Sequence, residues 1–359
     1  MEGKTWKVGI VGCGMVTQSI HLPTLLRLYE KFLVVGLCDV SPGALSHCAK
    51  KFGIAQTYAS SEALCAVKEI DIIVVANSDE FHAIVAIQAI NAGKHVLLEK
   101  PMALNHEDCE KIIAARDAKG VKVLVGLMRR YSPAVQTMVD EVASMGRVNF
   151  ARVRAIIGQN GQFLSQSTTD PRAFGVPVEF VEDSKEKQNA QLSKAVEKKE
   201  LFPIYRLLMG LSTHDTCILR KVLGMPKDVI GAKAWTANGQ PWITAMLDYG
   251  DYACMFETGL NQVMRFDAHI HIYGDKKDVM IQYDTPFIPL PITVTVREQL
   301  DDGIYVERVI RNTYEDCYTR EWNHFYDNLV NNTPIETTPE DAHQDLFTYD
   351  KILRALSSS

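Results

Sequence analysis

One lysine in this chain stands where parallel-sheet proteins commonly bind their ligands. Residues 96–98 (Val-Leu-Leu) form an apolar run that predicts a buried strand, and Glu99, Lys100 and Pro101 follow at its end. Ligands of open α/β sheets bind beyond the carboxyl ends of the strands, so we expect Lys100 at the mouth of a crevice. Its amine could transfer a proton there, and a cis bond before Pro101 would be one way to aim it. The other interpretation is that Lys100 only ends the strand.

A glycine turn near the N-terminus is the second chemical feature. Residues 6–11 are apolar and β-branched, and Gly12-Cys13-Gly14-Met15-Val16-Thr17 leads from them into a helical pattern. Strand, glycine turn and helix are the context of a dinucleotide-binding fingerprint. We expect Gly12 to make the turn and Gly14 to let the backbone approach a pyrophosphate, which the helix N-terminus at Met15 and Val16 would bind. Thr17 stands where the fingerprint has its third glycine.

An aspartate indicates which dinucleotide is bound. The strand predicted over residues 33–38 ends in Asp39, about where the fingerprint places the carboxylate that binds the adenosine ribose hydroxyls. A carboxylate repels a 2′-phosphate, and residues 40–43 contain no arginine. The sequence therefore favours NAD over NADP as the cofactor.

Strands and helices alternate through the first third of the chain. Further strands are predicted over residues 70–76, around Val96 and over 121–126, with helices over 82–92 and 107–118 between them. This βαβ alternation predicts a doubly wound parallel sheet. The expected fold class is α/β, with an N-terminal Rossmann domain over residues 1–126 and a C-terminal α+β domain over residues 127–359.

From Arg147 onward, strand-length runs are separated by short turns and no longer alternate with helices. These runs cover residues 147–157, 228–238, 242–249, 252–260, 266–273, 277–283, 292–298 and 304–312. They predict a mostly antiparallel open sheet in a meander, covered on one face by helices, including two expected over residues 318–329 and 339–356. His269 and His271 share a strand face, but no third ligand is suggested, so no metal site is predicted.

The stretch over residues 158–203 has little apolar periodicity and resembles an insertion. Its mixed-charge run, residues 183–187, is typical of a solvated helix face, whereas residues 158–163 are a candidate lid over the crevice. Pro203 then begins a helical pattern that ends at Gly224.

Four motifs give the chain a family resemblance. They are GCGMVT (12–17), ANSDEFH (76–82), AGKHVLLEKP (92–101) and GLMRRYSP (126–133). Together they resemble the Gfo/Idh/MocA family, the glucose-fructose oxidoreductase and inositol dehydrogenase group, closely in about the first third of the chain and more loosely beyond it. The resemblance implies an NAD(P)-dependent enzyme acting on sugars, polyols or related carbonyl compounds. It also implies assembly into a homodimer or homotetramer through the free face of the C-terminal sheet.

The resemblance further implies roles for particular side chains. Lys100 would stand in the active site, and Glu99 would contact the nicotinamide ribose. The other positions are Asn77, Ser78 and His82, which would line the cofactor cleft, and Arg129 to Tyr131, which would stand where the two domains meet. For His82, the alternative interpretation is a neighbour of a helix cap.

The helix that ends at Gly224 carries the second candidate proton donor. Members of the family commonly have an aspartate one turn before a histidine, so that the carboxylate orients the imidazole. By its distance from Gly224, His214 matches that histidine, and Gly210 occupies the aspartate position. Asp215 follows the histidine on a different helix face, so we expect it to bind substrate hydroxyls together with Arg129 and Tyr131. Alternatively, His214 is a packed core histidine.

Composition narrows the kind of partner. The formal net charge of −6 argues against nucleic acid or an anionic membrane and favours a small-molecule substrate. The eight cysteines form no C-x-x-C pair, which is typical of reduced thiols. The first strand starts too early for a signal peptide, and no run approaches the roughly 20 apolar residues of a membrane span. A cytoplasmic protein is expected.

These observations predict an oxidoreductase that moves a hydride between nicotinamide and a secondary alcohol or ketone of a sugar, polyol or glycoside-like substrate. Lys100 and His214 are its predicted catalytic residues. Two alternatives remain. One is a non-catalytic sensor that binds NAD and a metabolite, which the absence of the family aspartate at Gly210 favours. The other is a reductase of another C=O or C=N substrate.

Overall fold

The computed structural model describes residues 4–164, 171–288 and 290–357. The chain forms two compact units. The first contains Met1–Leu127, Leu164–Glu197 and Glu321–His343, and the second contains Met128–Phe163, Lys198–Arg320 and Gln344–Ser359. The first break lies one residue from the expected boundary at 126. Two later segments, which the sequence assigned to the second domain, lie in the first unit.

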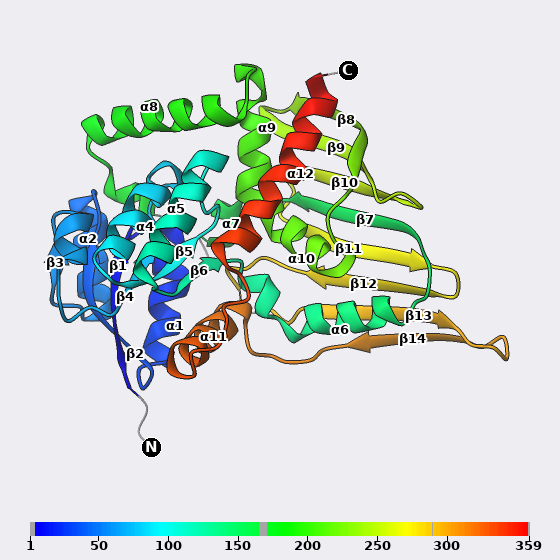
Figure 1. The fold of residues 1–359 in the computed structure, drawn as a ribbon, viewed down its shortest axis with the longest axis horizontal. Coiled ribbons are helices and arrows are strands. Elements are labelled where there is room, and N and C mark those ends of the chain that lie inside the picture. Colours follow the sequence, from blue (N-terminus) through cyan, green and yellow to red (C-terminus); the bar gives the residue numbers. More distant parts are fainter. Residues whose placement is uncertain (1–3, 165–170, 289, 358–359) are drawn as a thin grey trace. The chain divides into compact units, whose positions relative to one another are not determined.

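The first unit is built on a parallel sheet (Figure 1). Its strands are β1 (Trp6–Val11), β2 (Phe32–Cys38), β3 (Thr57–Tyr58), β4 (Ile72–Val75), β5 (His95–Glu99) and β6 (Val123–Gly126). They are ordered β3-β2-β1-β4-β5-β6 and all pair in parallel. This doubly wound order confirms the predicted Rossmann fold, whose ligands bind at the carboxyl ends of the strands beside the central switch point.

Helices connect these strands. They are η1 (Thr17–His21), α1 (Leu22–Arg27), α2 (Pro42–Phe52), α3 (Ser61–Cys65), η2 (Asp79–Phe81), α4 (His82–Asn91) and α5 (His106–Lys119). Local chemistry explains several ends. The Ser41 hydroxyl caps α2, and Gly53, at φ +68°, ends the same helix in the left-handed conformation.

The two later segments add helices to the first unit. Helix α8 (Val178–Ala195) packs against η2. Helix α11 (Cys317–Val330) places Trp322 against Phe32, with ring centroids 4.8 Å apart. The expectation that α11 covers the antiparallel sheet is therefore wrong for residues 321–330, because its aromatic side chains bury themselves against the parallel sheet instead.

The second unit is built on an eight-stranded sheet. Its strands are β7 (Val148–Ile157), β8 (Asp228–Ala237), β9 (Gln240–Asp248), β10 (Ala253–Leu260), β11 (Phe266–Gly274), β12 (Lys277–Tyr283), β13 (Thr293–Gln299) and β14 (Tyr305–Ile310). The order is β14-β13-β12-β11-β7-β10-β9-β8, and only β10 with β7 is a parallel pair. The mostly antiparallel sheet is confirmed, as two meanders on either side of β7.

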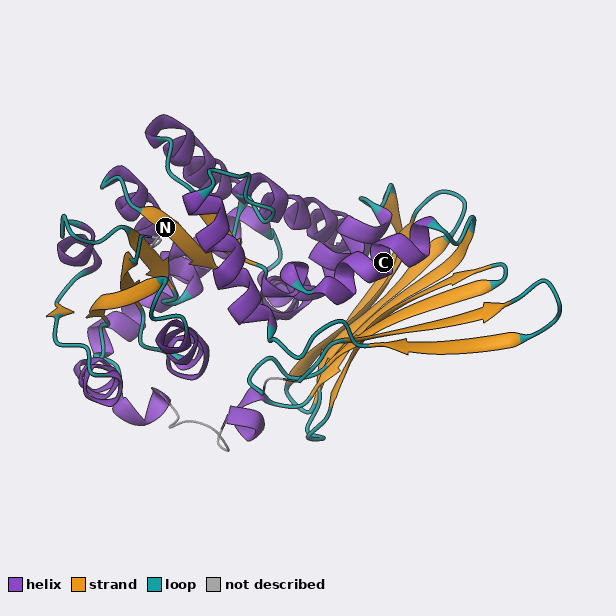
Figure 2. Cartoon of the chain, turned by 90° about the horizontal axis from the view of Figure 1, so that it is seen from below, coloured by secondary structure: helices purple, strands orange, loops and turns teal. Residues whose placement is uncertain are grey.

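Helices cover one face of this sheet, as Figure 2 shows. The helices of the second unit are η3 (Met128–Tyr131), α6 (Pro133–Ala143), α7 (Asn160–Leu164), η5 (Lys199–Leu201), α9 (Phe202–Leu207), η6 (Leu208–Ser212), α10 (Thr213–Leu223) and the later part of α12 (Pro339–Ser357). Helices α9, η6 and α10 follow one another without a break and end at Gly224, as predicted. No helix among the described residues is long and apolar enough to cross a membrane.

Candidate active site

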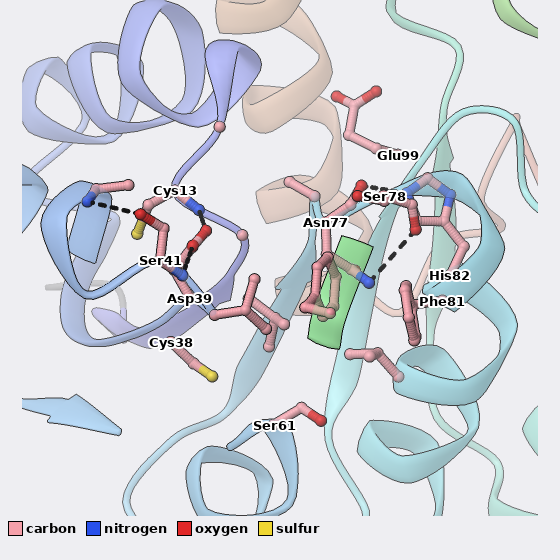
Figure 3. Close-up of a pocket in the computed structure, with 18 of the residues that line it drawn as sticks. Cys13, Cys38, Asp39, Ser41, Ser61, Asn77, Ser78, Phe81, His82 and Glu99 are labelled. Atoms are coloured by element: carbon pink, nitrogen blue, oxygen red, sulfur yellow. Dashed lines mark hydrogen bonds between the residues drawn. The ribbon is translucent and has the colours of Figure 1, made fainter. Parts of the chain in front are cut away.

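A cavity of about 630 Å³ opens at the carboxyl ends of β1, β2, β4 and β5 in the first unit (Figure 3). Its lining runs from Asp39 after β2 to Lys100 after β5. All ten residues predicted to bind the cofactor line it, namely Gly12, Gly14, Met15, Val16, Asp39, Asn77, Ser78, His82, Glu99 and Lys100. The cavity thus joins the predicted ribose-binding carboxylate to the predicted catalytic lysine.

The glycine turn leaves space for a pyrophosphate. Gly12 has φ +100°, and a Cβ on it would come within 2.3 Å of the carbonyl oxygen of Ala76, so a side chain there is excluded. A Cβ on Gly14 would meet no atom within 4 Å, so its backbone faces open space. Thr17, in place of the third glycine, donates its hydroxyl to the Gly12 carbonyl at 2.6 Å and holds the turn. The residues present therefore fit a bound dinucleotide.

Asp39 is held rigidly at the edge of the cavity. Its two carboxylate oxygens accept the backbone N–H groups of Cys13 and Ser41, each at 2.6 Å. Burial raises the pKa of Asp39 above its ordinary value, and these two hydrogen bonds oppose that rise. Each carboxylate oxygen has a second lone pair, so Asp39 can still accept ribose hydroxyls.

His82 connects two loops of the cavity. One ring nitrogen lies 2.7 Å from the carbonyl oxygen of Pro101, and the other lies 3.1 Å from that of Asn77. The Lys100–Pro101 peptide bond is cis. His82 is buried and lines the cavity. Through its hydrogen bond to the Pro101 carbonyl oxygen, it also supports the backbone next to Lys100.

Glu99 belongs to a buried network that the sequence did not reveal. Its carboxylate lies 2.9 Å from Nε2 of His21, and the indole N–H of Trp322 donates to Nδ1 of the same imidazole at 3.2 Å. An indole N–H can only donate, so the imidazole proton sits on Nε2 and points at Glu99. Burial alone would raise the pKa of Glu99, but the hydrogen bond and electrostatic interaction with His21 and the nearby charge of Lys100 lower it.

A second buried carboxyl group, Glu321, lies beside this network. Burial and the charge of Glu99 raise the pKa of Glu321 well above its ordinary value. Among the described residues, neither of its carboxyl oxygens has a hydrogen-bond partner. Ionisation is therefore favoured at Glu99 and disfavoured at Glu321.

His21→Phe is expected to reduce the free energy of unfolding by about 2–4 kcal/mol, because it leaves the buried Glu99 carboxylate without its imidazole partner. NAD should also bind more weakly, since Glu99 loses its fixed orientation. Denaturant unfolding and NAD titration measure the two effects. His95→Phe is the matched control, at the other end of β5, where the imidazole accepts the Lys122 backbone N–H and has no hydrogen-bonded carboxylate partner among the described residues. Equal losses in the two variants would contradict the proposed role of His21.

The second unit holds a buried charged cluster of three side chains. Arg129 Nη1 lies 3.3 Å from Asp215 Oδ1, and its guanidinium carbon stands 3.8 Å from the centroid of the Tyr283 ring. The Tyr283 hydroxyl donates to the same oxygen of Asp215. Arg129 and Asp215, both predicted to contact substrate, are thus brought together, and Tyr283 is an addition that no local motif indicated.

Burial governs the protonation of this cluster. It raises the pKa of Asp215 to about 6, although Arg129 and the Tyr283 hydrogen bond act in the opposite direction. Within the described part of the chain, Asp215 Oδ2 and Arg129 Nη2 make no hydrogen bond. The buried cluster therefore keeps unused hydrogen-bonding capacity on one carboxylate oxygen and one guanidinium nitrogen.

His214 precedes Asp215 in α10 and is also buried. Gly210, the position of the family aspartate, lies in η6, and a Cβ there would meet no atom within 4 Å. Packing thus does not force the loss of that carboxylate. Tyr131 is buried too, and its carbonyl oxygen accepts a hydrogen bond from Arg320 at 2.9 Å.

The paired histidines of β11 are engaged with carboxylates. His271 Nε2 lies 2.6 Å from Asp278, and His269 lies 3.4 Å from Asp267. Within residues 4–164, 171–288 and 290–357, no group of three metal-ligating side chains comes together.

Comparison with known proteins relates the chain to oxidoreductases. Residues 6–127 match the sequence model of GFO_IDH_MocA, the "Oxidoreductase family, NAD-binding Rossmann fold". The chain is 37% identical over 129 residues to inositol 2-dehydrogenase of Salmonella paratyphi B, an alignment that spans 35% of this chain and only 38% of that relative. Inositol 2-dehydrogenase 2 of Saccharopolyspora erythraea is 25% identical over 323 residues, which cover 88% of this chain and 83% of the relative.

A solved structure extends the likeness of fold to nearly the whole chain. Biliverdin reductase from Synechocystis, in complex with biliverdin and NADP+, matches with a TM-score of 0.70 at 18% identity, covering 98% of this chain and 99% of that one. The glycine turn, Asp39, Glu99 and Lys100, which line the cavity, all fall inside the matched residues 6–127. Over residues 6–127 the chain therefore matches the NAD-binding domain of the Gfo/Idh/MocA oxidoreductases.

Proposed function

We propose that the protein is an NAD-dependent dehydrogenase or reductase acting on a secondary alcohol or ketone of a sugar, polyol or glycoside-like substrate. One observation carries the proposal, namely that Asp39 and Lys100 line the same cavity. Asp39 would hold the adenosine ribose and the turn at Gly14 the pyrophosphate, which would leave the end of the cavity at Glu99 and Lys100 for the nicotinamide half. The inositol dehydrogenases among the relatives support the substrate class.

Lys100 is the proposed proton-handling residue next to the cofactor. The bound nicotinamide supplies or accepts the hydride at C4. Lys100 takes the proton of the substrate hydroxyl during oxidation, or donates a hydrogen bond to the developing alkoxide. Glu99, held by His21, would accept the hydroxyls of the nicotinamide ribose and so fix the distance between this ribose and the neighbouring lysine.

The second unit would supply the substrate contacts and a second proton donor. We assign His214 to proton transfer, and Arg129, Tyr131 and Asp215 to substrate hydroxyls. The unused hydrogen-bonding capacity of Asp215 Oδ2 and Arg129 Nη2 supports this assignment, because a polyol hydroxyl can donate to one and accept from the other.

The direct test of this function is nicotinamide absorbance with the purified protein, NAD and a panel of sugars, polyols and glycosides. Production of NADH with at least one member is the expected result. A second outcome is that NAD binds, no member of the panel is oxidised, and no ketone or imine is reduced with NADH. That outcome would favour the non-catalytic sensor that the missing carboxylate at Gly210 allows. Turnover of a C=N compound alone would favour the reductase alternative.

Asp39 predicts cofactor preference. NAD is expected to bind at least tenfold more tightly than NADP, since a phosphate beside this buried carboxylate costs on the order of 1.4 kcal/mol or more. Asp39→Ser should narrow the ratio of the two dissociation constants measured by titration. Asp71→Ser is the control. Asp71 directly precedes β4, at the amino ends of the parallel strands and away from the cavity, so its replacement should leave the ratio unchanged. Equal binding of NAD and NADP by the unmodified protein would refute the assignment.

We also propose that the protein is a homodimer or homotetramer, assembled through the face of the second sheet that lies opposite its helices. Alternating strand residues put charged side chains of both signs there, such as Arg154 and Glu257, whose side chains lie 2.7 Å apart. Such a face can meet a second copy of itself with opposite charges aligned. Sedimentation analysis should show a dimer or tetramer, and a monomer at micromolar concentration would refute this proposal.

A further inference from the structure

Part of the cofactor cavity is walled by residues from outside the βαβ units. Val176 and Phe180 line the cavity, although they lie about 80 residues beyond Lys100 in the chain. They belong to residues 174–191, which we name the covering segment and which includes most of α8. The sequence predicted only a solvated helix face for part of it, and its role at the cavity was not foreseen.

One end of the covering segment is anchored beside α2. The ring of Phe174 lies 4.8 Å from that of His47, and a Cβ on Gly43 would come within 3.1 Å of Phe174 Cβ. The missing side chain of Gly43 therefore makes room for this contact. Helix α2 begins three residues after Asp39, so this anchor lies at the adenosine end of the cavity.

The other end is anchored on η2 by stacking and by buried hydrogen bonds. The rings of Phe180 and Phe81 stack with centroids 5.1 Å apart and an interplanar angle of 21°. Glu80 is 2% exposed, and its carboxylate accepts the Ser184 hydroxyl. The Gln191 side chain donates to the Glu80 carbonyl oxygen at 2.7 Å. A buried glutamate bonded in this way fixes α8 to the cavity wall.

Between its anchors the covering segment presents apolar surface to the cavity. Val176 is 45% exposed although it lines the cavity, and the Phe180 ring is partly exposed beside it. Figure 3 shows Asp39 and Phe81 on opposite sides of the cavity. An aromatic, largely apolar ring bound between them would cover the apolar surface that these residues leave open.

We infer that Phe180 and Val176 bind the adenine ring of the dinucleotide and that the covering segment sets the affinity for its adenosine half. This inference rests on the proposed NAD dependence. Because Asp39 and the Phe174 anchor stand at the same end of the cavity, the segment acts on adenosine and leaves the nicotinamide half to Glu99 and Lys100.

Calorimetric titration with NAD and with ADP-ribose, which lacks the nicotinamide ring, tests the inference. Phe180→Ala is expected to weaken both ligands by the same factor, about tenfold, the usual size of a lost aromatic contact. Phe180→Leu keeps apolar packing on Phe81 and should lose less. Amide hydrogen exchange over residues 178–191 should slow when ADP-ribose binds to the unmodified protein.

Val178→Ala is the matched control, because Val178 lies on the same helix, is 71% exposed and does not line the cavity. Its affinities should equal those of the unmodified protein, and circular dichroism should show every variant folded. Unchanged ADP-ribose affinity in Phe180→Ala, or an equal loss in Val178→Ala, would overturn the inference. If the unmodified protein bound neither ligand, the proposed function itself would fail, an outcome distinct from loss of the Phe180 effect alone.

Discussion

Lys100→Ala is expected to lower kcat by roughly 10²-fold or more, the usual size of a general acid–base contribution, while the affinity for NAD changes only a few-fold. The lysine is partly buried at the end of β5, where it lines the cavity beside Glu99. In the proposed binding mode, the glycine turn and Asp39 hold most of the cofactor. Removal of the amine therefore removes proton transfer more than binding.

Steady-state kinetics and NAD titration on the same preparations measure this separation. Lys68→Ala is the matched control, since Lys68 is an exposed lysine of the same unit that does not line the cavity. Turnover of Lys100→Ala at the unmodified rate would show that Lys100 only ends the strand. A large loss of NAD affinity would instead make it a cofactor-binding residue.

His214→Ala should chiefly lower kcat, whereas Asp215→Asn should chiefly raise KM. We assign His214 to proton transfer and the free oxygen of Asp215 to a substrate hydroxyl, so the two neighbours differ in the step they affect. Loss of kcat with an unchanged KM in Asp215→Asn would place Asp215 in the proton path. Full activity in both variants would leave proton transfer to Lys100 alone.

The pH dependence gives this prediction a second measurement. The pKa of Asp215 is raised to about 6 by burial, so KM of the unmodified protein should rise as pH falls through about 6 and the carboxylate is protonated. Asp215→Asn should abolish this dependence. Tyr283→Phe removes a hydrogen bond that lowers the pKa, and it should move the midpoint to higher pH.

The raised pKa of Asp215 also makes the stability of the folded protein depend on pH. Because the pKa of Asp215 in the folded protein lies above its ordinary value of 3.8, ionisation of this group opposes folding. The contribution of protonated Asp215 to the free energy of unfolding is fully present below pH 3.8 and is lost as pH rises through about 6. Denaturant unfolding between pH 4 and 7 should show this loss in the unmodified protein and not in Asp215→Asn.

Local chemistry explains why much of the first unit could be predicted. Strand β1 was predicted over its full range, Trp6–Val11, because Val8, Ile10 and Val11 are apolar and β-branched, and residues 8–11 are buried as in a parallel sheet covered on both faces. The turn after it needs φ +100° at residue 12, which only glycine adopts without strain, so Gly12 marks the turn in the sequence itself. Asp39 follows at the distance that one βαβ crossover requires.

The contacts that orient these groups have no such local signature. His21, Glu99 and Trp322 form one network from three distant parts of the chain, and Tyr283 reaches Asp215 from a strand 68 residues later. In the sequence the covering segment shows little apolar periodicity and a mixed-charge run, although it stacks Phe180 on Phe81. Each of these contacts joins residues that are far apart in the sequence. Local sequence patterns therefore do not predict which buried polar or aromatic side chains contact each other.

The sequence by itself thus determined the sheet classes, the glycine turn, the strand-end positions of Asp39 and Lys100, and the helix that carries His214. These depend on backbone conformation and side-chain periodicity, which act over a few residues. Only the tertiary structure decided that residues 164–197 and 321–343 join the first unit, that His21 orients Glu99, and that Arg129, Asp215 and Tyr283 form one cluster. The physical reason is that burial must satisfy polar groups and fill space with whatever the fold brings near, however distant in the chain.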